Sequence, residues 1–450
     1  MLQDGTAGTI DRVARPERAL VLLPALNRAA KTRQPAQRSA EARLEEGVGL
    51  ARAIDLEVVD AMIVPLASLR PATLVGSGKV EEIAGMVENE KIGLVVVDHA
   101  LTPVQQRNLE KAWKTKVIDR TALILEIFGE RAQTKEGVLQ VELAHLNYQK
   151  GRLVRSWTHL ERQRGGFGFL GGPGETQIEA DRRMIETRIK RIEKDLEGVV
   201  STRDLQRQNR RRQGTPIVAL VGYTNAGKST LFNRLTHADT RAEDMLFATL
   251  DPTLRKIELP QGAEAILSDT VGFISELPTH LVAAFRATLE EVVQADLILH
   301  VRDIAHADTA AQAHDVETVL RQLGLAPEES GRFIEVWNKV DLLPPGERRN
   351  GNGGPHASGI QTIAVSALTG EGIDALLAAI EARVTPDHET YRVTLSGAEL
   401  ANLHRLYELG EVRERTDLEN GDIVAVTRVP TASINRFLSL FPHATGTKRD

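Results

Sequence analysis

The hydrophobic pattern of residues 41–147 alternates between two periods. Short apolar runs that suit buried strands are separated by stretches with the period of amphipathic helices. In chain order these stretches are 40–54 (helix), 57–65 (strand), 79–90 (helix), 92–98 (strand), 103–113 (helix) and 116–119 (strand). This alternation favours a small parallel α/β domain at 41–147. Residues 1–40 are rich in Arg, Ala, Pro and Gln with weak periodicity, so we expect a mostly disordered extension there.

A helical hairpin is predicted at residues 148–213. Helix-like patterns at 138–157 and 177–205 flank the segment 164–174, which is too rich in glycine for a helix or a strand. The second pattern has one apolar stripe, formed by Ile178, Ile185, Ile189, Ile192 and Leu196. Two helices joined by a long glycine-rich loop indicate a hairpin with that loop at its tip.

The second half of the chain predicts two further domains. An apolar run at 217–221, a glycine-containing loop and an amphipathic run at 230–235 indicate strand, loop and helix, which open a doubly wound sheet domain at 214–386. Residues 387–450 combine strand-like alternation with two helical stretches and are predicted to form a small α+β domain. The predicted fold class is therefore α/β overall.

Composition narrows the class of protein. The chain has 450 residues, a hydrophobic fraction of 42% and no cysteine, which excludes disulfides and thiolate metal sites. No apolar run approaches the roughly 20 residues of a membrane span. The first residues also lack the apolar core of a signal peptide. We expect a cytoplasmic protein without a membrane span, acting as a monomer.

Charge is distributed unevenly along the chain. The net charge is −6, yet residues 150–213 carry 16 Lys and Arg against 9 Asp and Glu, which is +7 and leaves −13 elsewhere. A basic arm on an acidic chain suggests a polyanion, with aromatic rings stacking on bases. The candidate RNA contacts are Arg162, Arg164, Gly165, Gly166, Phe167, Gly168 and Phe169. A solvated helical surface is the competing interpretation, and Arg210–Arg212 fit either a linker or a phosphate contact.

The loop Gly222–Ser229 carries the most specific chemistry. Its sequence, Gly-Tyr-Thr-Asn-Ala-Gly-Lys-Ser, matches the phosphate-binding loop between a strand and a helix. Backbone N–H groups are expected to surround the phosphates, Lys228 to reach the β- and γ-phosphates, and Ser229 to ligate Mg²⁺. A second loop, Gly76–Lys79, lacks the first glycine and the hydroxyl after the lysine. A plain turn or helix start is favoured there over a phosphate contact.

Two further motifs complete the predicted metal site. Asp269-Thr-Val-Gly272 follows a strand-like run, where an aspartate can hold the Mg²⁺ shell and the Gly272 amide can contact the γ-phosphate. In the segment 247–253 we choose Thr249 as the second hydroxyl ligand, with Thr253 as the alternative. The predicted metal ligands are Ser229, Thr249 and Asp269, and the predicted catalytic residues are Lys228, Thr249 and Gly272.

Asn338-Lys-Val-Asp341 indicates a guanine base. The Asp341 carboxylate can accept both N1–H and the 2-amino group of guanine, a pair of donors that adenine lacks. Asn338 can reach the base edge, Lys339 can cover the ring, and the Ala367 backbone can contact the guanine O6. All predicted nucleotide contacts are Gly222, Tyr223, Thr224, Asn225, Ala226, Gly227, Lys228, Ser229, Thr230, Phe247, Ala248, Thr249, Leu250, Asp251, Asp269, Thr270, Val271, Gly272, Asn338, Lys339, Asp341, Ser366 and Ala367.

These motifs together resemble those of translation-factor-like GTPases, and more narrowly those of HflX-type ribosome-associated GTPases. The resemblance runs from residue 41 to the C-terminus and rests on 222–233, 247–251, 269–273, 338–341 and the glycine-rich 165–177. It implies binding of GTP and GDP, the large ribosomal subunit and its rRNA as partner, and entry of the hairpin into the peptidyl-transferase region. It also implies splitting of stalled ribosomes, as after heat stress. Residues 1–40 and the hydrophilic insert 345–359 depart from the family pattern without touching a motif.

Phe273 occupies the position where many small GTPases carry a glutamine that orients the attacking water. A phenyl ring cannot do this, so we expect slow intrinsic hydrolysis that a partner accelerates. Two other functions stay open: a GTPase that assists ribosome assembly or RNA modification without splitting, and an interaction protein that uses nucleotide to stabilise its fold. The sequence also leaves open whether the N-terminal domain binds a second nucleotide such as ATP.

Overall fold

The computed structural model divides the chain into two compact units, one of residues 1–257 and 266–373 and one of 258–265 and 374–450. The residues it describes are 16–26, 38–163, 173–212, 215–238, 246–247, 249–275, 286–327, 331–344, 360–385, 388–397, 399–418, 420–430 and 433–447. Within these ranges no helix is both long enough and apolar enough to span a membrane.

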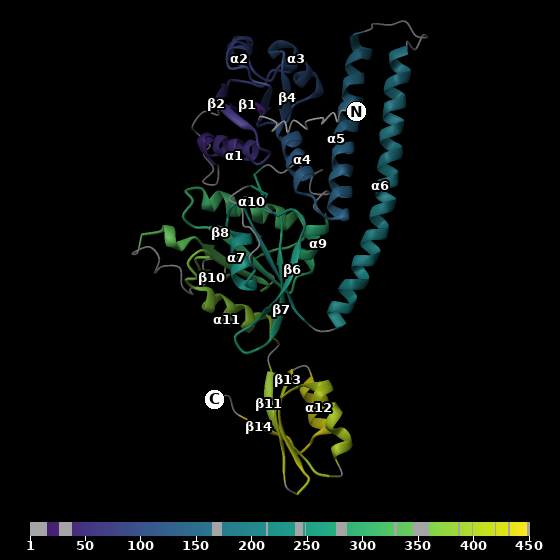
Figure 1. Cartoon of the computed structure of the whole chain (residues 1–450), viewed down its shortest axis with the longest axis vertical. Coiled ribbons are helices and arrows are strands. Elements are labelled where there is room, and N and C mark those ends of the chain that lie inside the picture. Colours follow the sequence, from purple (N-terminus) through teal and green to yellow (C-terminus); the bar gives the residue numbers. More distant parts are fainter. Residues whose placement is uncertain are drawn as a thin grey trace, which may run out of the picture. The chain divides into compact units, whose positions relative to one another are not determined.

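A parallel sheet of four strands forms the N-terminal domain in the described part of the first unit (Figure 1). Its strand order is β2-β1-β3-β4. The elements are β1 (Arg18–Leu26), α1 (Ala40–Arg52), β2 (Glu57–Leu66), α2 (Ser77–Asn89), β3 (Leu94–Val97), α3 (Pro103–Trp113), β4 (Lys116–Asp119) and α4 (Arg120–Arg131). All six elements predicted between 40 and 119 are present, with slightly shifted ends. Gly76–Lys79 marks the start of α2, and Lys79 pairs with Glu82.

The expectation of a mostly disordered extension at 1–40 is wrong for Arg18–Leu26. These residues form β1, which lies inside the sheet and pairs in parallel with both β2 and β3. Ala19–Leu23 are buried on both faces of the sheet. Such a strand is a continuous apolar run without alternation, so a search for periodicity does not detect it.

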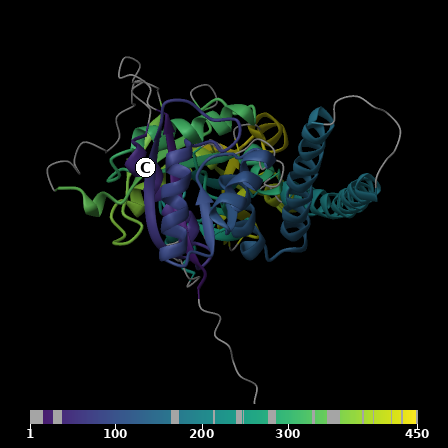
Figure 2. The ribbon, with the colours of Figure 1, turned by 90° about the horizontal axis from the view of Figure 1, so that it is seen from above.

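Two long helices follow, α5 (Lys135–Gln163) and α6 (Pro173–Arg212), and they pack against each other, with α5 also packed on α4 (Figures 1 and 2). Ile189 and Ile192 of the predicted apolar stripe are buried. Partly exposed ion pairs join the two helices, Arg188 with Glu142 and Lys150 with Glu186. Part of the basic charge of this region is thus paired within the hairpin, which is what the solvated-surface interpretation expects.

The nucleotide domain is built on a second sheet, with described strands in the order β10-β9-β8-β5-β7-β6. The neighbours from β10 to β7 pair in parallel. The elements are β5 (Ile217–Gly222), α7 (Lys228–Thr236), β6 (Thr253–Glu258), β7 (Glu264–Asp269), α9 (Arg286–Gln294), β8 (Leu297–Asp303), α10 (Thr309–Gln322), β9 (Phe333–Asn338), η3 (Val340–Leu342) and β10 (Gln361–Ala364). The strand order reverses around β5, and doubly wound sheets bind ligands at the carboxyl ends of the strands at such a point.

The second unit contains an antiparallel sheet, with described strands in the order β12-β13-β11-β14. Its mainly aliphatic core contains three aromatic rings, and the Phe437 ring packs 5.3 Å from that of Tyr391 and 5.1 Å from that of Phe441. Its elements are α11 (Ile373–Val384), β11 (His388–Leu395), η5 (Leu400–Asn402), α12 (Leu403–Leu409), β12 (Glu411–Asp417), β13 (Ile423–Pro430), α13 (Ile434–Leu440) and β14 (Thr445–Thr447). The predicted fold class, α/β with a small C-terminal α+β domain, is confirmed.

Candidate nucleotide-binding site

The phosphate-binding loop joins β5 to α7, as the sequence predicts. Gly227 has a φ of +87°, which favours glycine, and a Cβ there would lie 2.2 Å from Asn338 Nδ2. Lys228 is the first residue of α7 and is buried, with its Nζ donating to the Tyr223 carbonyl at 2.8 Å. Burial lowers the pKa of Lys228 to about 8. The loop therefore presents a buried amine and a helix N-terminus, two groups that favour an anion.

Three side-chain oxygens meet beside the loop. Ser229 Oγ lies 3.0 Å from Thr249 Oγ1, and both hydroxyls donate to Asp269 Oδ2 at 2.8 Å. Asp269 Oδ1 is buried without a hydrogen-bond partner among the described residues. Burial raises the pKa of Asp269, which a nearby cation would counteract. Two hydroxyls and a carboxylate are hard oxygen donors, so the set fits Mg²⁺. Thr253, the alternative, is exposed at the start of β6.

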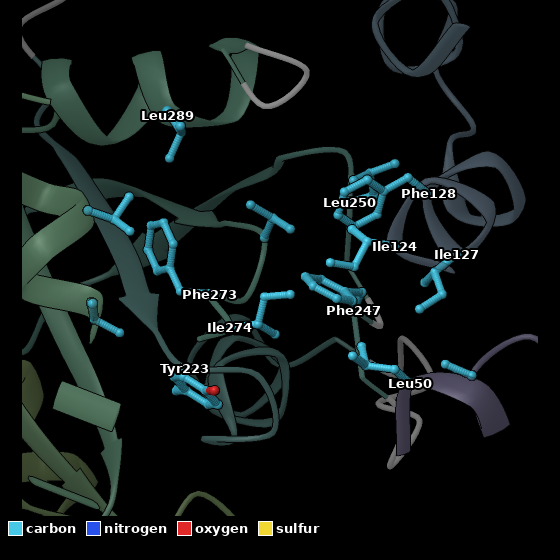
Figure 3. Close-up of a cluster of buried hydrophobic side chains, with 14 of the residues drawn as sticks. Leu50, Ile124, Ile127, Phe128, Tyr223, Phe247, Leu250, Phe273, Ile274 and Leu289 are labelled. Atoms are coloured by element: carbon cyan, nitrogen blue, oxygen red, sulfur yellow. The ribbon is translucent and has the colours of Figure 1, made fainter. Parts of the chain in front are cut away.

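The segment after Asp269 runs back along the loop. A Cβ at Gly272 would lie 2.9 Å from the backbone Cα of Thr224 and 3.0 Å from Lys228 Nζ, so the close approach of this segment to the phosphate loop requires glycine. Phe273 bonds to the loop through its backbone, with its N–H donating to the Gly222 carbonyl and its carbonyl accepting from Thr224 N–H. Its ring is buried in the apolar cluster of Figure 3. The side chain after Gly272 therefore serves packing and offers no polar group to a water molecule.

Asn338 ties the predicted base-binding motif to the phosphate loop. Its Nδ2 donates to the Ala226 carbonyl at 2.9 Å, and its Oδ1 accepts from Ala367 N–H at 3.0 Å. Arg234 on α7 donates to the Ala367 carbonyl at 3.0 Å and so holds the same loop from the other side. Asp341 is the second residue of η3, the short helix that begins directly after Lys339. Lys339 is in the αL conformation, and its Nζ pairs with Asp303 at 2.8 Å. Asn338 thus connects the phosphate loop with the loop that contains Ala367, at the place where the sequence predicts the guanine base.

A buried ionic network joins the N-terminal domain to this site, and no sequence pattern predicts it. Arg120 donates to Asp98 and Glu46, each at 2.6 Å, and to the Ser275 carbonyl at 2.9 Å. The Tyr223 hydroxyl, in the phosphate loop, donates to Glu46 and accepts from Ser275 N–H at 2.8 Å. The carboxyl ends of the N-terminal strands therefore contact both the phosphate loop and the segment after Gly272.

The charges of this network stabilise one another. Burial alone would raise the pKa of Glu46, but the guanidinium groups of Arg120 and Arg38 hold it below its ordinary value. Burial alone would lower the pKa of Arg120, but the carboxylates of Asp98 and Glu46 raise it above its ordinary value. A buried charge that loses its partner is strongly destabilising. The network thus favours one fixed arrangement of the two domains.

An apolar cluster crosses the same boundary (Figure 3). On the nucleotide side, Phe247 and Leu250 flank Thr249 and are buried. The Phe247 ring meets that of Phe128 on α4 edge to face, with centroids 4.9 Å apart. The labelled members are Leu50, Ile124, Ile127 and Phe128 from the N-terminal domain and Tyr223, Phe247, Leu250, Phe273, Ile274 and Leu289 from the nucleotide domain.

Several predicted contacts fall outside these observations. Ala248 and the candidate RNA contacts Arg164, Gly165, Gly166, Phe167, Gly168 and Phe169 lie outside the described residues. Arg162 lies in α5. The structure places the other predicted nucleotide contacts at or just after the carboxyl ends of β5, β7, β9 and β10, in the first turn of α7 and in the segment before β6.

Because His300 on β8 is buried, we expect the folded protein to lose stability in acid. Its side chain is buried, its Nε2 has no hydrogen-bond partner among the described residues, and burial lowers its pKa to about 4. The neutral ring stabilises the fold fully above the unfolded pKa of about 6.5, and this contribution is lost as pH falls through the folded pKa. The free energy of unfolding of the nucleotide-free protein should therefore fall by about 2 kcal/mol between pH 7 and pH 5.

Urea titrations at both pH values would measure this effect, with His300→Gln as the comparison variant. Carboxylates with lowered pKa values, such as Glu46 and Glu335, lose their contribution only below about pH 4.5 and do not interfere. His300→Gln is expected to reduce the difference between pH 7 and pH 5. An equal difference in both proteins would show that His300 is not its source.

Comparison with known proteins finds matches along most of the chain, from residue 41 to residue 445. Residues 41–129 match the GTP-binding GTPase N-terminal family, 131–210 the GTP-binding GTPase middle region, 217–339 the 50S ribosome-binding GTPase family and 356–445 the HflX C-terminal domain. GTPase HflX of Magnetococcus marinus is 52% identical over 410 residues, 89% of this chain and 91% of its own. GTPase HflX of Escherichia coli is 43% identical over 399 residues, 89% and 92% of the two chains.

One solved structure also shows similarity to this chain. It is that of a GTP-binding protein from the hyperthermophilic archaeon Sulfolobus solfataricus in complex with GDP. It matches 82% of this chain and 99% of its own at 22% identity, with a TM-score of 0.43. Likeness at that level adds nothing to what the sequence relatives show.

Proposed function

The chain belongs to the HflX family of GTPases, and we propose that it binds the large ribosomal subunit and splits or rescues stalled ribosomes. GTP hydrolysis acts as the timer for its release. The observation that carries this proposal is the meeting of Ser229, Thr249 and Asp269, because two hydroxyls and a carboxylate beside a phosphate loop are the donors that a Mg²⁺–GTP site needs. Its partner in this role is suggested by residues 217–339, which match a family described as ribosome-binding.

The proposed roles at the phosphates follow from the geometry. Lys228 neutralises the β- and γ-phosphates from inside the loop, and the Gly272 amide binds a γ-phosphate oxygen. Ser229, Thr249 and Asp269 would hold Mg²⁺, which would supply positive charge next to the phosphates. The proposed ligand set contains one carboxylate, and no group of three or more His, Cys, Asp or Glu side chains that could hold a metal occurs in the described ranges.

The proposed reading of the base rests on Asn338, Asp341 and Ala367. Asp341 accepts the two guanine donors, and the Ala367 backbone contacts O6. Asn338 fixes both loops through its amide, as its bonds to Ala226 and Ala367 indicate. We propose that the protein acts as a monomer, in the cytoplasm where ribosomes are found.

Partner-stimulated turnover is the first test. The buried ring of Phe273 supplies no group for the attacking water, so the isolated protein should hydrolyse GTP slowly. Large ribosomal subunits should raise its turnover by at least about tenfold if they order the loops around Thr249 and Gly272. Turnover measured with purified large subunits, and with small subunits as the control, checks this. Equal rates with both subunits would contradict the proposed partner.

Sedimentation distinguishes splitting from other ribosomal roles. Intact ribosomes incubated with the protein and GTP should shift to the separate subunits. Ser229→Ala, which lacks one proposed metal ligand, should cause no shift. Stimulated turnover without a shift would instead favour a role in ribosome assembly or RNA modification. Neither stimulation nor shift would favour an interaction protein that uses the nucleotide to stabilise its fold.

A further inference from the structure

The segment Phe247–Asp251 connects three parts of the molecule at once. Phe247 and Leu250 insert into the apolar cluster against α4 (Figure 3). Between them, the Thr249 hydroxyl points the other way, to Asp269 at 2.8 Å. Asp251 follows, and its side chain contacts Gln133 and Thr134, which lie outside the nucleotide domain. Five residues therefore join the metal end of the site to the N-terminal half of the chain.

Asp251 binds the start of α5, the first helix of the hairpin. Its Oδ2 accepts from Gln133 N–H and from Thr134 N–H, each at 2.8 Å, and its Oδ1 accepts the Thr134 hydroxyl at 2.5 Å. The Thr134 hydroxyl oxygen in turn accepts from Gly137 N–H at 3.0 Å, which makes it the capping group of α5. A carboxylate at a helix N-terminus is favoured by the helix dipole as well.

Gly137 provides independent evidence that the contact between Asp251 and the start of α5 is specific. Glycine is a poor helix former, yet it occupies the first turn of α5. A Cβ at this position would lie 2.3 Å from Asp251 Oδ1. The missing side chain is what lets the carboxylate approach the helix, so the two residues fit each other across 114 positions of sequence (251 − 137).

We infer that Asp251 is a positioning residue, which holds Thr249 at the metal only while it caps α5. The inference rests on the proposed GTP and Mg²⁺ site. Thr249 is two residues before Asp251 in the chain. The contact of Thr249 with Asp269 and the contact of Asp251 with the start of α5 are therefore made or lost together. Coupling of this kind is reciprocal. A bound γ-phosphate favours the capped hairpin helix, and a displaced hairpin favours release of Thr249 and slower hydrolysis.

Hydrogen exchange on the full-length protein tests the coupling without reference to activity. The amides of Gln133 and Thr134 bond to Asp251, so a peptide spanning 132–138 reports the contact. A slowly hydrolysed GTP analogue with Mg²⁺ should slow exchange there by about tenfold relative to GDP, the effect of charge-assisted bonds to one carboxylate. Asp251→Asn should abolish the difference and lower kcat by about tenfold, with GDP affinity changed less than about twofold.

Two further variants separate coupling from loss of structure. Gly137→Ala keeps every hydrogen-bonding group and favours the helix, but displaces Asp251, so it should reproduce the effects of Asp251→Asn. Thr102→Val removes the capping hydroxyl of α3 in the same domain and should leave exchange at 132–138 and kcat unchanged. Unchanged kcat and exchange in Gly137→Ala would overturn the inference.

The outcomes also distinguish this inference from the proposed function. The analogue should protect a peptide spanning 222–229 in every variant. If it protects that peptide in the unmodified protein and leaves 132–138 unaffected, the coupling alone is wrong. If it protects neither peptide, the proposed nucleotide site is wrong as well.

Discussion

Replacing Lys228 by alanine is expected to lower the rate of GTP hydrolysis by roughly a thousandfold, the upper range for losing one group that stabilises transition-state charge. The amine is buried at the first residue of α7 and bonds to the Tyr223 carbonyl, which aims it into the loop. Burial has already lowered its pKa, so the free protein bears the cost of holding a charge there that a triphosphate would compensate. Alanine supplies neither the charge nor the donor.

Single-turnover hydrolysis and equilibrium binding of a fluorescent GTP analogue would measure this loss. The matched control is Lys79→Ala. Like Lys228, Lys79 follows a glycine-containing turn, here Gly-Ser-Gly, but it pairs with Glu82 at the surface. That variant should retain binding and turnover. Circular dichroism would establish that both variants are folded. Turnover in folded Lys228→Ala close to that of the unmodified chain would remove the phosphate-loop assignment, and a similar loss in Lys79→Ala would point to a second site.

The sequence predicts the local structure of the phosphate loop because the residues of that loop are contiguous. Eight adjacent residues fix the turn at Gly227 and the start of α7 at Lys228, with little help from the rest of the chain. Thr249 and Asp269 are 20 residues apart, yet each follows a recognisable motif, and the structure brings their oxygens to 2.8 Å. Asp269 and the phosphate loop lie at the carboxyl ends of two neighbouring parallel strands, β7 and β5, so the order of the strands brings them together.

Contacts between domains are harder to predict, because no local pattern marks them. Glu46 sits in an amphipathic helix and Arg120 at a helix start, where charged residues are ordinarily exposed. Both are buried, since each is the partner of the other across the N-terminal domain. β1 escapes prediction for a related reason: its apolar run alone does not distinguish a strand buried on both faces from a hydrophobic stretch of a tail. Only the assembled sheet makes that difference.

Phe273 shows how these two kinds of information combine. The sequence says that the residue after Gly272 cannot orient water, and the structure adds where the ring goes instead. It packs in the cluster that also contains Phe247 and Phe128, so the segment after Gly272 and the segment that carries Thr249 share one core with the N-terminal domain. A partner that moves α4 or α5 would therefore act on both segments that a γ-phosphate contacts.

Replacing Asp341 by asparagine is expected to reduce GTP affinity by at least about a hundredfold, and to create preference for xanthosine triphosphate. A site built to bond a polar group rejects an analogue that lacks it, because buried donors and acceptors are left unpaired. Asparagine presents an NH₂ group to the guanine 2-amino group, donor against donor. Xanthine carries a carbonyl oxygen at that position, which accepts the new donor, while the amide oxygen still accepts N1–H.

Competition binding with guanosine, xanthosine and adenosine triphosphates on the variant and the unmodified protein would test this reversal. Asp374→Asn, the same chemical change at an exposed position in the first turn of α11, is the matched control and should keep guanine selectivity. The position of Asp341 is set by Asn338, whose bonds to Ala226 and Ala367 do not involve the altered side chain, so the loop should stay in place. A variant that loses guanosine triphosphate without gaining the xanthosine form would mean that Asp341 holds the loop and does not read the base.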